Sequence, residues 1–256
     1  MYTYTSGYNQ EEVYMSAGQT LGGCAIGIIR IGALWFPYMP GNINNPTTFN
    51  FPVYYKWMEG SPGIDQIITT EPDPAFLEKA IKAAKALEQM GCRAIIGSCG
   101  YFASFLTEIA TAVNVPCFLS SLMQVPIISR ALKPTQKVGI ICANGRVLSS
   151  APALEACRID PSTIVIAGAE NLSQMQNVIQ SRGHLNNVKF EQELVMLAKE
   201  MVTNNPDVGA ILLECTEMPP YAWAIQKAVR LPVFDFTTMV NWVYNAVVRR
   251  PFTGFI

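Results

Sequence analysis

Two cysteines, Cys99 and Cys215, occupy matching places in an internal repeat of this sequence. Each follows a short apolar run, residues 93–97 in the first case and 209–213 in the second. Sliding the chain over itself by 116 residues aligns residues 94–121 with 210–237 without a gap, and eight of the 28 positions are identical. The identical pairs are Ala94/Ala210, Ile95/Ile211, Cys99/Cys215, Ile109/Ile225, Ala112/Ala228, Val113/Val229, Pro116/Pro232 and Phe118/Phe234. The repeat predicts two similar half-structures, each of which delivers one cysteine.

The type and position of these two residues predict acid–base chemistry at carbon. A helix is predicted to begin shortly after each cysteine, near Tyr101 and near Met218. Unpaired backbone N–H groups and the positive end of a helix dipole favour a thiolate, so we expect both thiols to lie near ionisation at neutral pH. If the repeat sets the sulfurs on opposite faces of a substrate, one thiolate removes a proton and the opposite thiol returns one, which inverts the configuration.

The carbanion formed in such a step needs its charge spread onto an adjacent carboxylate, and residues that follow the cysteines are suited to bind that anion. The predicted donors are the backbone N–H groups of Gly100, Tyr101, Thr216 and Glu217. The Thr216 hydroxyl is a further donor. Glu217 is alternatively a partner for a substrate amino group, and an ionised carboxylate this close to Cys215 raises the pKa of the thiol.

Three residues on other loops complete the predicted site. Arg30 follows the first apolar run and is suited to a second carboxylate, although a structural ion pair explains it equally well. Asn144 follows the equivalent run of the second half and is predicted to mirror Arg30. Asn45 lies in the polar segment 32–50, which is expected to overhang the site, but turn formation explains its asparagines equally well.

Short apolar runs alternate with amphipathic segments along the chain, a pattern that predicts an α/β fold with mostly parallel sheets. Strands are predicted at 24–30, 51–57, 93–97, 116–119, 138–142, 163–167, 209–213 and 232–234, and helices at 73–91, 101–113, 147–157, 189–204 and 218–229. We expect a first lobe over residues 1–122, joined by a C-terminal helix over 235–256, and a second lobe over 123–234. The carboxyl ends of the two sheets are expected to face a shared cleft.

Composition excludes several classes of function. The 256 residues carry a net charge of −1, so the chain has no broad cationic surface for nucleic acid or for an anionic membrane. Charged residues make up only 14% of the chain, which favours a subunit contact, and no apolar run reaches the ~18 residues of a membrane span. The seven cysteines form no CxxC pair, which indicates free thiols in a reducing, cytoplasmic compartment.

The residue types also argue against common catalytic groups. His184 is the single histidine and lies in a polar run, so neither a histidine-dependent triad nor a multi-histidine metal site is expected. No lysine motif suggests pyridoxal phosphate. We therefore predict an enzyme that needs no cofactor and no metal.

Two motifs carry a family resemblance. Residues 95–101 (IIGSCGY) and 212–221 (LLECTEMPPY) resemble the two cysteine motifs of the aspartate/glutamate racemase superfamily, and the segment 232–235 (PVFD) is similar too. The resemblance extends from about Gly27 to Tyr244. It implies two pseudo-symmetric Rossmann-like lobes with a cleft between them, proton transfer between two thiols, no cofactor and commonly a homodimer.

The chain departs from glutamate racemases at several positions. Gly100-Tyr101 stands where those enzymes have Asn-Thr, Thr216-Glu217 where they have Thr-His, and Arg30-Ile31 where they have Asp-Ser. The segment 40–46 (PGNINNP) resembles a less characterised branch of the superfamily. Glutamate is therefore not the expected substrate.

Taken together, the sequence predicts a racemase or epimerase of an amino acid or a related small carboxylate, with Cys99 and Cys215 as the two bases. Two alternatives stay open. The first is a decarboxylase or cis-trans isomerase of a small dicarboxylate, in which one of these cysteines carries the key step. The second is a small-molecule binding protein, because duplicated α/β lobes also close on ligands without chemistry.

Overall fold

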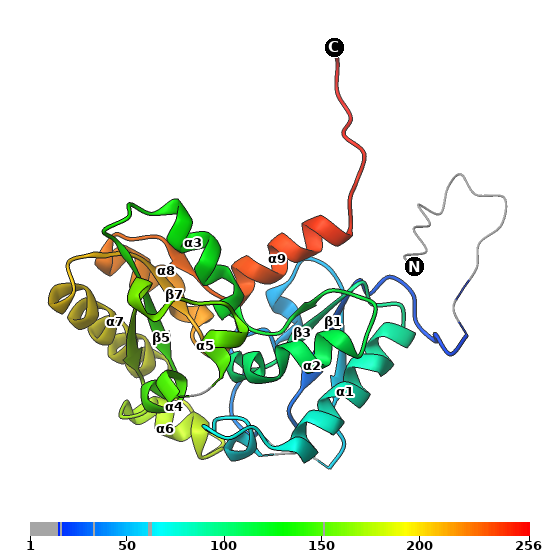
Figure 1. Cartoon of the computed structure of the whole chain (residues 1–256), viewed down its shortest axis with the longest axis horizontal. Coiled ribbons are helices and arrows are strands. Elements are labelled where there is room, and N and C mark those ends of the chain that lie inside the picture. Colours follow the sequence, from blue (N-terminus) through cyan, green and yellow to red (C-terminus); the bar gives the residue numbers. More distant parts are fainter. Residues whose placement is uncertain (1–14, 16, 33, 61–62, 151) are drawn as a thin grey trace.

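The computed structural model describes residues 15, 17–32, 34–60, 63–150 and 152–256, and over these residues the chain forms two four-stranded parallel sheets (Figure 1). The first sheet has the order β2-β1-β3-β4 and the second the order β6-β5-β7-β8. The strands are β1 Ile26–Arg30, β2 Val53–Trp57, β3 Ala94–Gly97, β4 Cys117–Phe118, β5 Lys137–Cys142, β6 Ile164–Gly168, β7 Val208–Leu213 and β8 Val233–Phe234. The two orders are equivalent, so the predicted α/β fold of two similar lobes is confirmed.

Central strands of both sheets are covered on both faces, which explains why their sequences are continuous apolar runs. All residues of β3 and of β7 are buried, and so are those of β1 except Arg30 at its end. All pairs are parallel, so the carboxyl ends of the strands in each sheet lie along one edge. Cys99 and Cys215 both leave the carboxyl end of a central strand, β3 and β7 respectively.

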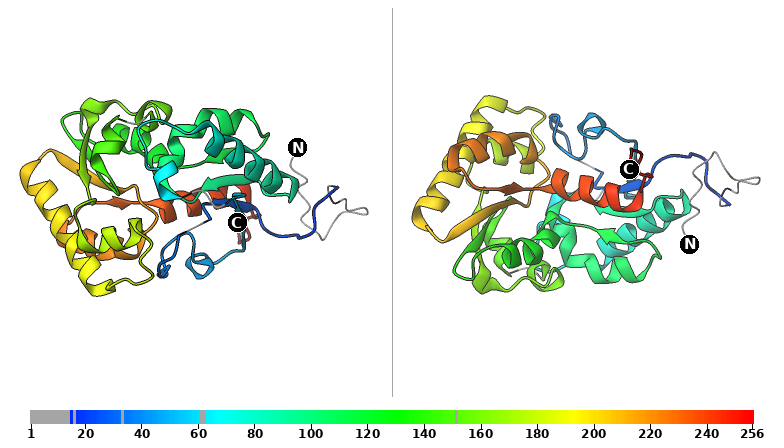
Figure 2. Two further views of the ribbon diagram at one scale, coloured as in Figure 1. Left: turned by 90° about the horizontal axis from the view of Figure 1, so that it is seen from below. Right: turned by 90° about the horizontal axis from the view of Figure 1, so that it is seen from above.

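Helices cover the sheets on both sides (Figure 2). They are α1 Pro74–Gln89, α2 Leu106–Thr111, α3 Val125–Ala131, α4 Gly145–Ser150, α5 Ala153–Ala156, α6 Ser173–Ile179, α7 Asn187–Asn204, α8 Ala222–Val229 and α9 Phe236–Val247. Short 3-10 turns are η1 Pro46–Thr48, η2 Ile64–Gln66, η3 Gly100–Phe105, η4 Ser121–Gln124, η5 Pro161–Thr163 and η6 Pro219–Tyr221. In α1 the Asp73 side chain accepts a hydrogen bond from the N–H of Ala75, and Gly91 just past its end has a φ of +85° that glycine adopts without strain.

Four predicted helices differ from the structure. The segment 218–229 begins as the 3-10 turn η6 and becomes α-helical only at Ala222. The segment after Cys99 begins as the 3-10 turn η3 and becomes α-helical only at Leu106. The segment 147–157 is divided into α4 and α5, and Pro152 precedes α5. The predicted helix 235–256 ends at Val247, since Pro251 disfavours helical backbone at the residue before it, and the last residues extend away from the lobes (Figure 1). Helices α3 and α6 were not predicted.

Although α9 lies at the end of the chain, it packs on the first sheet. Its apolar residues Phe236, Met239 and Val240 share a core with Ile26 and Ile96. The side chain of Asp235 begins the helix by accepting a hydrogen bond from the N–H of Thr238. The proposed lobe boundaries at 122 and 234 stay predictions.

Hydrogen bonds join the two lobes close to the cysteines. The Tyr101 hydroxyl donates to the carbonyl of Asn144 at 2.6 Å, and the Thr216 hydroxyl lies 3.3 Å from the carbonyl of Ser98. The lobes therefore meet along a polar seam on which both cysteine turns lie. Separately, no helix within the described residues has the length and hydropathy needed to cross a bilayer.

Candidate active site

Cys99 lies at the start of η3, where its thiol is partly buried. The backbone N–H of Tyr101 donates a hydrogen bond to the sulfur, an interaction that favours the thiolate. Burial opposes it, and together with the charges of Glu214 and Glu217 it raises the pKa of the Cys99 thiol well above its usual value. The expectation that the turn alone brings this thiol near ionisation at neutral pH is therefore wrong, because desolvation outweighs one N–H donor.

Cys215 has a different set of partners. Its side chain is 6% exposed, and its thiol donates a hydrogen bond to Oε2 of Glu217 at 2.9 Å. The N–H of Met218 donates to the carbonyl of Cys215 at 3.1 Å, and the 3-10 turn η6 follows at Pro219. Burial and the charges of Glu217 and Glu214 raise the pKa of this thiol well above its usual value. The expectation of a readily ionised thiol is wrong here as well.

The two sulfurs belong to one site, because a charge on Cys99 contributes to the raised pKa of Cys215. Four other described cysteines are buried and unbridged, as the sequence predicts for small core residues: Cys92, Cys117, Cys142 and Cys157. The catalytic roles of Cys99 and Cys215 stay predictions.

Glu217 is the polar centre of the second cysteine turn. Its Oε2 also accepts a hydrogen bond from the Thr216 hydroxyl at 2.9 Å, and its Oε1 accepts one from Nδ2 of Asn42 at 3.2 Å. Burial raises the pKa of the Glu217 carboxyl, and these hydrogen bonds lower it in part. Asn42 comes from the loop between β1 and β2 and was not predicted, because nothing in the sequence indicates which of the clustered asparagines crosses to the second lobe.

Gly100 and Glu214 meet across the lobe interface. A methyl group at Gly100 would overlap the carboxyl of Glu214, so the two lobes close as they do only because position 100 has no side chain. Glu214 is fully buried, and its Oε1 has no hydrogen-bond partner within the described chain. Glu214 is not among the predicted site residues.

Arg30 ends β1 next to the first cysteine turn, since the N–H of Ile31 donates to the hydroxyl of Ser98 at 3.1 Å. Its guanidinium lies 4.4 Å above the ring of Tyr38 and 5.3 Å from the ring of Trp57. One N–H of Arg30 donates to the carbonyl of Asn44 at 3.3 Å, but the buried Nε has no partner in the described structure. No described carboxylate forms an ion pair with Arg30, so the structural ion pair considered above is absent from this part of the chain.

Two predicted substrate contacts use their side chains locally instead. Oδ1 of Asn45 accepts from the N–H of Thr47 at the start of η1, and its Nδ2 donates to the carbonyl of Tyr38. Oδ1 of Asn144 accepts from the N–H of Val147 at the start of α4. Tyr101 is fully buried and directs its hydroxyl to the backbone of Asn144 rather than to open space. The structure therefore brings Cys99, Gly100, Thr216, Cys215, Glu217 and Arg30 toward one site and holds Asn45 and Asn144 in turns.

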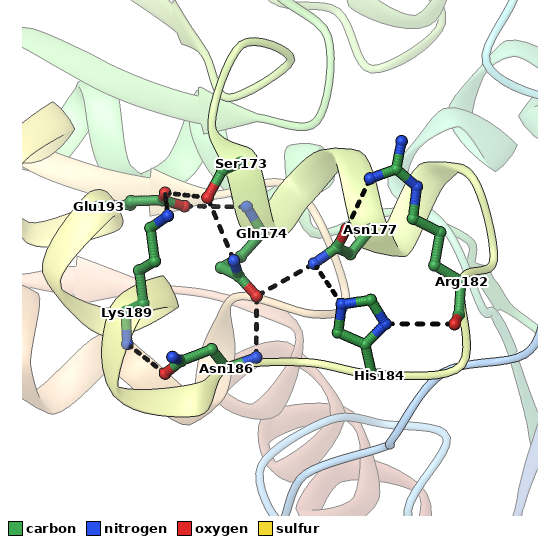
Figure 3. A network of polar contacts seen from close by, with 8 residues as sticks. All are labelled: Ser173, Gln174, Asn177, Arg182, His184, Asn186, Lys189 and Glu193. Carbon is green, nitrogen blue, oxygen red and sulfur yellow. Dashed lines mark hydrogen bonds and ion pairs between the residues drawn. The ribbon is translucent and has the colours of Figure 1, made fainter.

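The loop between β1 and β2 crosses to the second lobe above this site. The N–H of Gly183 donates to the carbonyl of Trp35 at 2.9 Å, and a Cβ at Gly183 would lie 2.7 Å from the Trp35 ring. A network of side chains around α6 and the start of α7 holds the turn that carries Gly183 (Figure 3). In it Gln174 accepts from the N–H of Asn186, and Asn177 contacts the ring of His184. This network positions the loop; it forms no catalytic group.

A small cavity lies beside Glu217 between this loop and the second lobe. It is lined by Phe36, Pro37, Met39, Asn42, Val178, Leu185, Glu217, Pro220 and Tyr221. The cavity has a volume of about 10 Å³, which is the space of a single water molecule, so it holds no substrate group in this structure. Over the described residues, no cluster of three or more His, Cys, Asp or Glu side chains has the arrangement of a metal site.

The sequence matches the Asp/Glu/Hydantoin racemase family over residues 58–242. The chain belongs to this family. Solved structures share its fold: glutamate racemase isoform RacE1 from Bacillus anthracis has a TM-score of 0.55 at 12% identity, with 87% of this chain and 82% of that chain covered. Unliganded arylmalonate decarboxylase has a TM-score of 0.54 at 16% identity, covering 88% and 92%.

Its curated relatives carry a different activity in their names. The chain is 32% identical to dimethylsulfoniopropionate lyase 7 of Emiliania huxleyi over 90% of its own length and 69% of that protein. It is 30% identical to lyase 6 of the same organism, covering 90% of this chain and 61% of that protein. A dimethylsulfoniopropionate lyase of Durusdinium sp. clade D is 27% identical, covering 90% and 77%. The chain therefore spans about two thirds of the length of the relatives it matches.

Proposed function

We propose that this protein is a lyase that removes the proton next to the carboxylate of dimethylsulfoniopropionate, or of a similar sulfonium acid, and expels dimethyl sulfide. The observation that carries this proposal is that the two sulfurs have opposite hydrogen-bond roles. Cys99 accepts an N–H hydrogen bond, whereas Cys215 donates its proton to Glu217. An elimination needs one thiolate base, and racemisation needs two groups that exchange the roles of acid and base. The named relatives support the same reaction class.

The charges of the site fit a substrate with a carboxylate at one end and a cation at the other. Arg30 offers a buried N–H without a partner, which is suited to the carboxylate. Glu217 lies beside Cys215, and the negative charge of its ionised carboxylate complements a sulfonium. A bound cation favours the ionised form of Glu217 and so offsets the effect of burial on its pKa.

The proposed step is a β-elimination. The Cys99 thiolate takes the proton from the carbon next to the carboxylate and becomes a thiol. The electron pair of the broken C–H bond forms the carbon–carbon double bond, and the bond between the β-carbon and sulfur breaks with its electrons on sulfur. Acrylate and neutral dimethyl sulfide result, and Cys99 returns its proton to solvent. Cys215 keeps its proton and holds Glu217 in place.

The test is direct. Purified protein is incubated with dimethylsulfoniopropionate, dimethyl sulfide is measured in the headspace by gas chromatography, and acrylate is measured by NMR. We expect stoichiometric release of both products, loss of the activity in Cys99→Ser, and unchanged activity in Cys24→Ser, which alters a partly buried cysteine elsewhere. Absence of both products with wild-type protein refutes the proposal.

A racemase or epimerase is the second candidate, and the repeat that gives each lobe one cysteine favours it. Amino and hydroxy acids incubated in deuterated water distinguish the two. A racemase incorporates deuterium next to the carboxylate and loses optical rotation without forming an alkene. The other expectations, namely independence from cofactors, a homodimer and a cytoplasmic location, are part of this proposal as predictions.

A further inference from the structure

Glu214 is a buried acid that the proposed mechanism does not use. It is the first residue after β7, it is fully buried, and its Oε2 accepts a hydrogen bond only from the N–H of Ala143, at 3.3 Å. Its Oε1 is without a hydrogen-bond partner among the described residues. An ionised carboxylate with so little compensation is costly to bury, so the position needs an explanation beyond packing.

The carboxyl of Glu214 reaches across the lobe interface to the first cysteine turn. It occupies the space that a side chain at position 100 would take, directly beside the peptide that follows Cys99. On its other side, its backbone N–H donates to the carbonyl of Ile141 in β5 at 2.8 Å, within the second lobe. Glu214 is thus fixed by the second lobe and faces the nucleophilic turn of the first.

The titratable groups that face Glu214 and Cys99 are all acids. Cys99, Tyr101, Cys142, Cys215 and Glu217 interact electrostatically with Glu214. No described lysine, arginine or histidine contributes to the pKa of Glu214 or of Cys99. Burial raises the pKa of Glu214 to about 8, and after burial itself the charge of Glu214 is the strongest influence that raises the pKa of Cys99. At neutral pH the carboxyl therefore keeps its proton.

We propose that Glu214 is a positioning residue that sets the charge state of Cys99 from the opposite lobe. The uncharged acid permits the Cys99 thiolate, and the ionised carboxylate suppresses it by repulsion. Gly100 is required because only glycine lets the carboxyl approach this turn. The inference deepens the proposed lyase function, since it concerns the state of the base, but it is tested without any substrate.

The experiment measures the rate at which iodoacetamide alkylates Cys99 between pH 6 and 10.5, by mass spectrometry of the peptide that contains it. We expect Glu214→Gln to move the midpoint of this profile down by roughly one to two pH units, because a charge near the thiol is removed. Cys24, which is partly buried and alkylated in the same sample, is the internal reference, and its profile is expected to stay unchanged.

Glu214→Met removes the charge with a side chain of similar length and is expected to give the same downward shift. A third measurement needs no variant: the infrared C=O stretch of a protonated carboxyl in wild-type protein is expected at pH 7 and is lost as the pH rises through about 8. An unchanged or raised Cys99 midpoint in either variant overturns the proposal. So does a wild-type spectrum without this band at pH 7.

These outcomes are separate from those of the lyase assay. If the wild-type protein releases dimethyl sulfide but Glu214→Gln shows no shift, the lyase function is supported and the role of Glu214 is refuted. If Glu214→Gln shows the shift but the wild-type protein makes no dimethyl sulfide, the role of Glu214 is supported and the proposed lyase function is refuted.

Discussion

The two cysteine turns come from equivalent places in two equivalent sheets, yet they present opposite hydrogen-bond chemistry. In the first lobe Cys99 begins a 3-10 turn and its sulfur accepts an N–H from Tyr101. In the second lobe Cys215 also begins a turn, in which the N–H of Met218 donates to the Cys215 carbonyl at 3.1 Å, but its sulfur donates to Glu217. Duplication of the fold has therefore not been accompanied by duplication of the chemistry. A matched pair of thiols is therefore not by itself evidence for a matched pair of bases.

The side chains next to the two cysteine turns also differ in charge. The first turn lies next to Arg30, a cation with an unpaired N–H. The second carries Glu217, held by Asn42 and Thr216. This polarity gives the site a cationic and an anionic end, which suits a zwitterionic substrate better than the symmetric environment that racemisation favours.

Replacement of each sulfur is the most severe test of this comparison. Cys99→Ser is expected to lower kcat for dimethyl sulfide release by roughly 10³- to 10⁴-fold, because it removes the base. Cys215→Ser keeps a hydroxyl donor to Glu217 and is expected to cost about 10²-fold or less. Steady-state kinetics of both variants measure the two losses of kcat, and their ratio shows which sulfur matters more. Equal and complete losses would instead support two interchangeable bases.

The pH dependence of stability tests whether Glu214 differs from ordinary acids. Its pKa is raised from 4.5 to about 8 in the folded protein. Below about pH 4.5 both states are protonated; between about pH 4.5 and 8 the unfolded state ionises first, so stability falls as pH rises, and above about pH 8 the loss is complete. Relative to Glu214→Gln, we expect the wild-type free energy of unfolding to fall over this window by on the order of 3 kcal/mol or more.

Urea titrations of both proteins at pH 5, 6.5 and 8 measure that difference. A constant gap between wild type and Glu214→Gln across the three pH values contradicts a buried, protonated carboxyl.

Removal of the Arg30 charge tests whether this residue binds the carboxylate end of the substrate. Arg30→Met is expected to lower kcat/KM by roughly 10- to 100-fold, mainly through a higher KM, because a charged hydrogen bond to the carboxylate is lost. The exposed Arg146 provides a matched control, and Arg146→Met is expected to leave both constants unchanged. A variant at Arg30 with normal KM shows that the carboxylate binds elsewhere.

The smallest effect is expected at the second turn. Asn42→Ala removes one hydrogen bond to Glu217 and is expected to raise KM by about 10-fold or less while the alkylation profile of Cys99 stays unchanged. Asn45→Ala removes the cap of η1 instead, so it is expected to lower thermal stability with KM unaltered. The reverse pattern contradicts the assignment of these two asparagines.

The sequence by its own patterns predicted the strands and the positions of the two cysteines. Apolar runs of strand length and a repeat spaced by 116 residues are local and internal signals, and they predicted all eight strands and placed Cys99 and Cys215 at the carboxyl ends of β3 and β7. Parallel strands end along one edge, so these signals sufficed to indicate one site.

Only the tertiary structure decided how that site is charged. Asn42 reaches Glu217 over 175 positions of sequence, and Glu214 faces Gly100 only because the lobes are closed. The sequence predicted readily ionised thiols from a helix start, whereas burial raises the pKa of both. Desolvation of a thiol depends on every chain segment that excludes water from it. The local spacing of residues in the sequence therefore does not predict it.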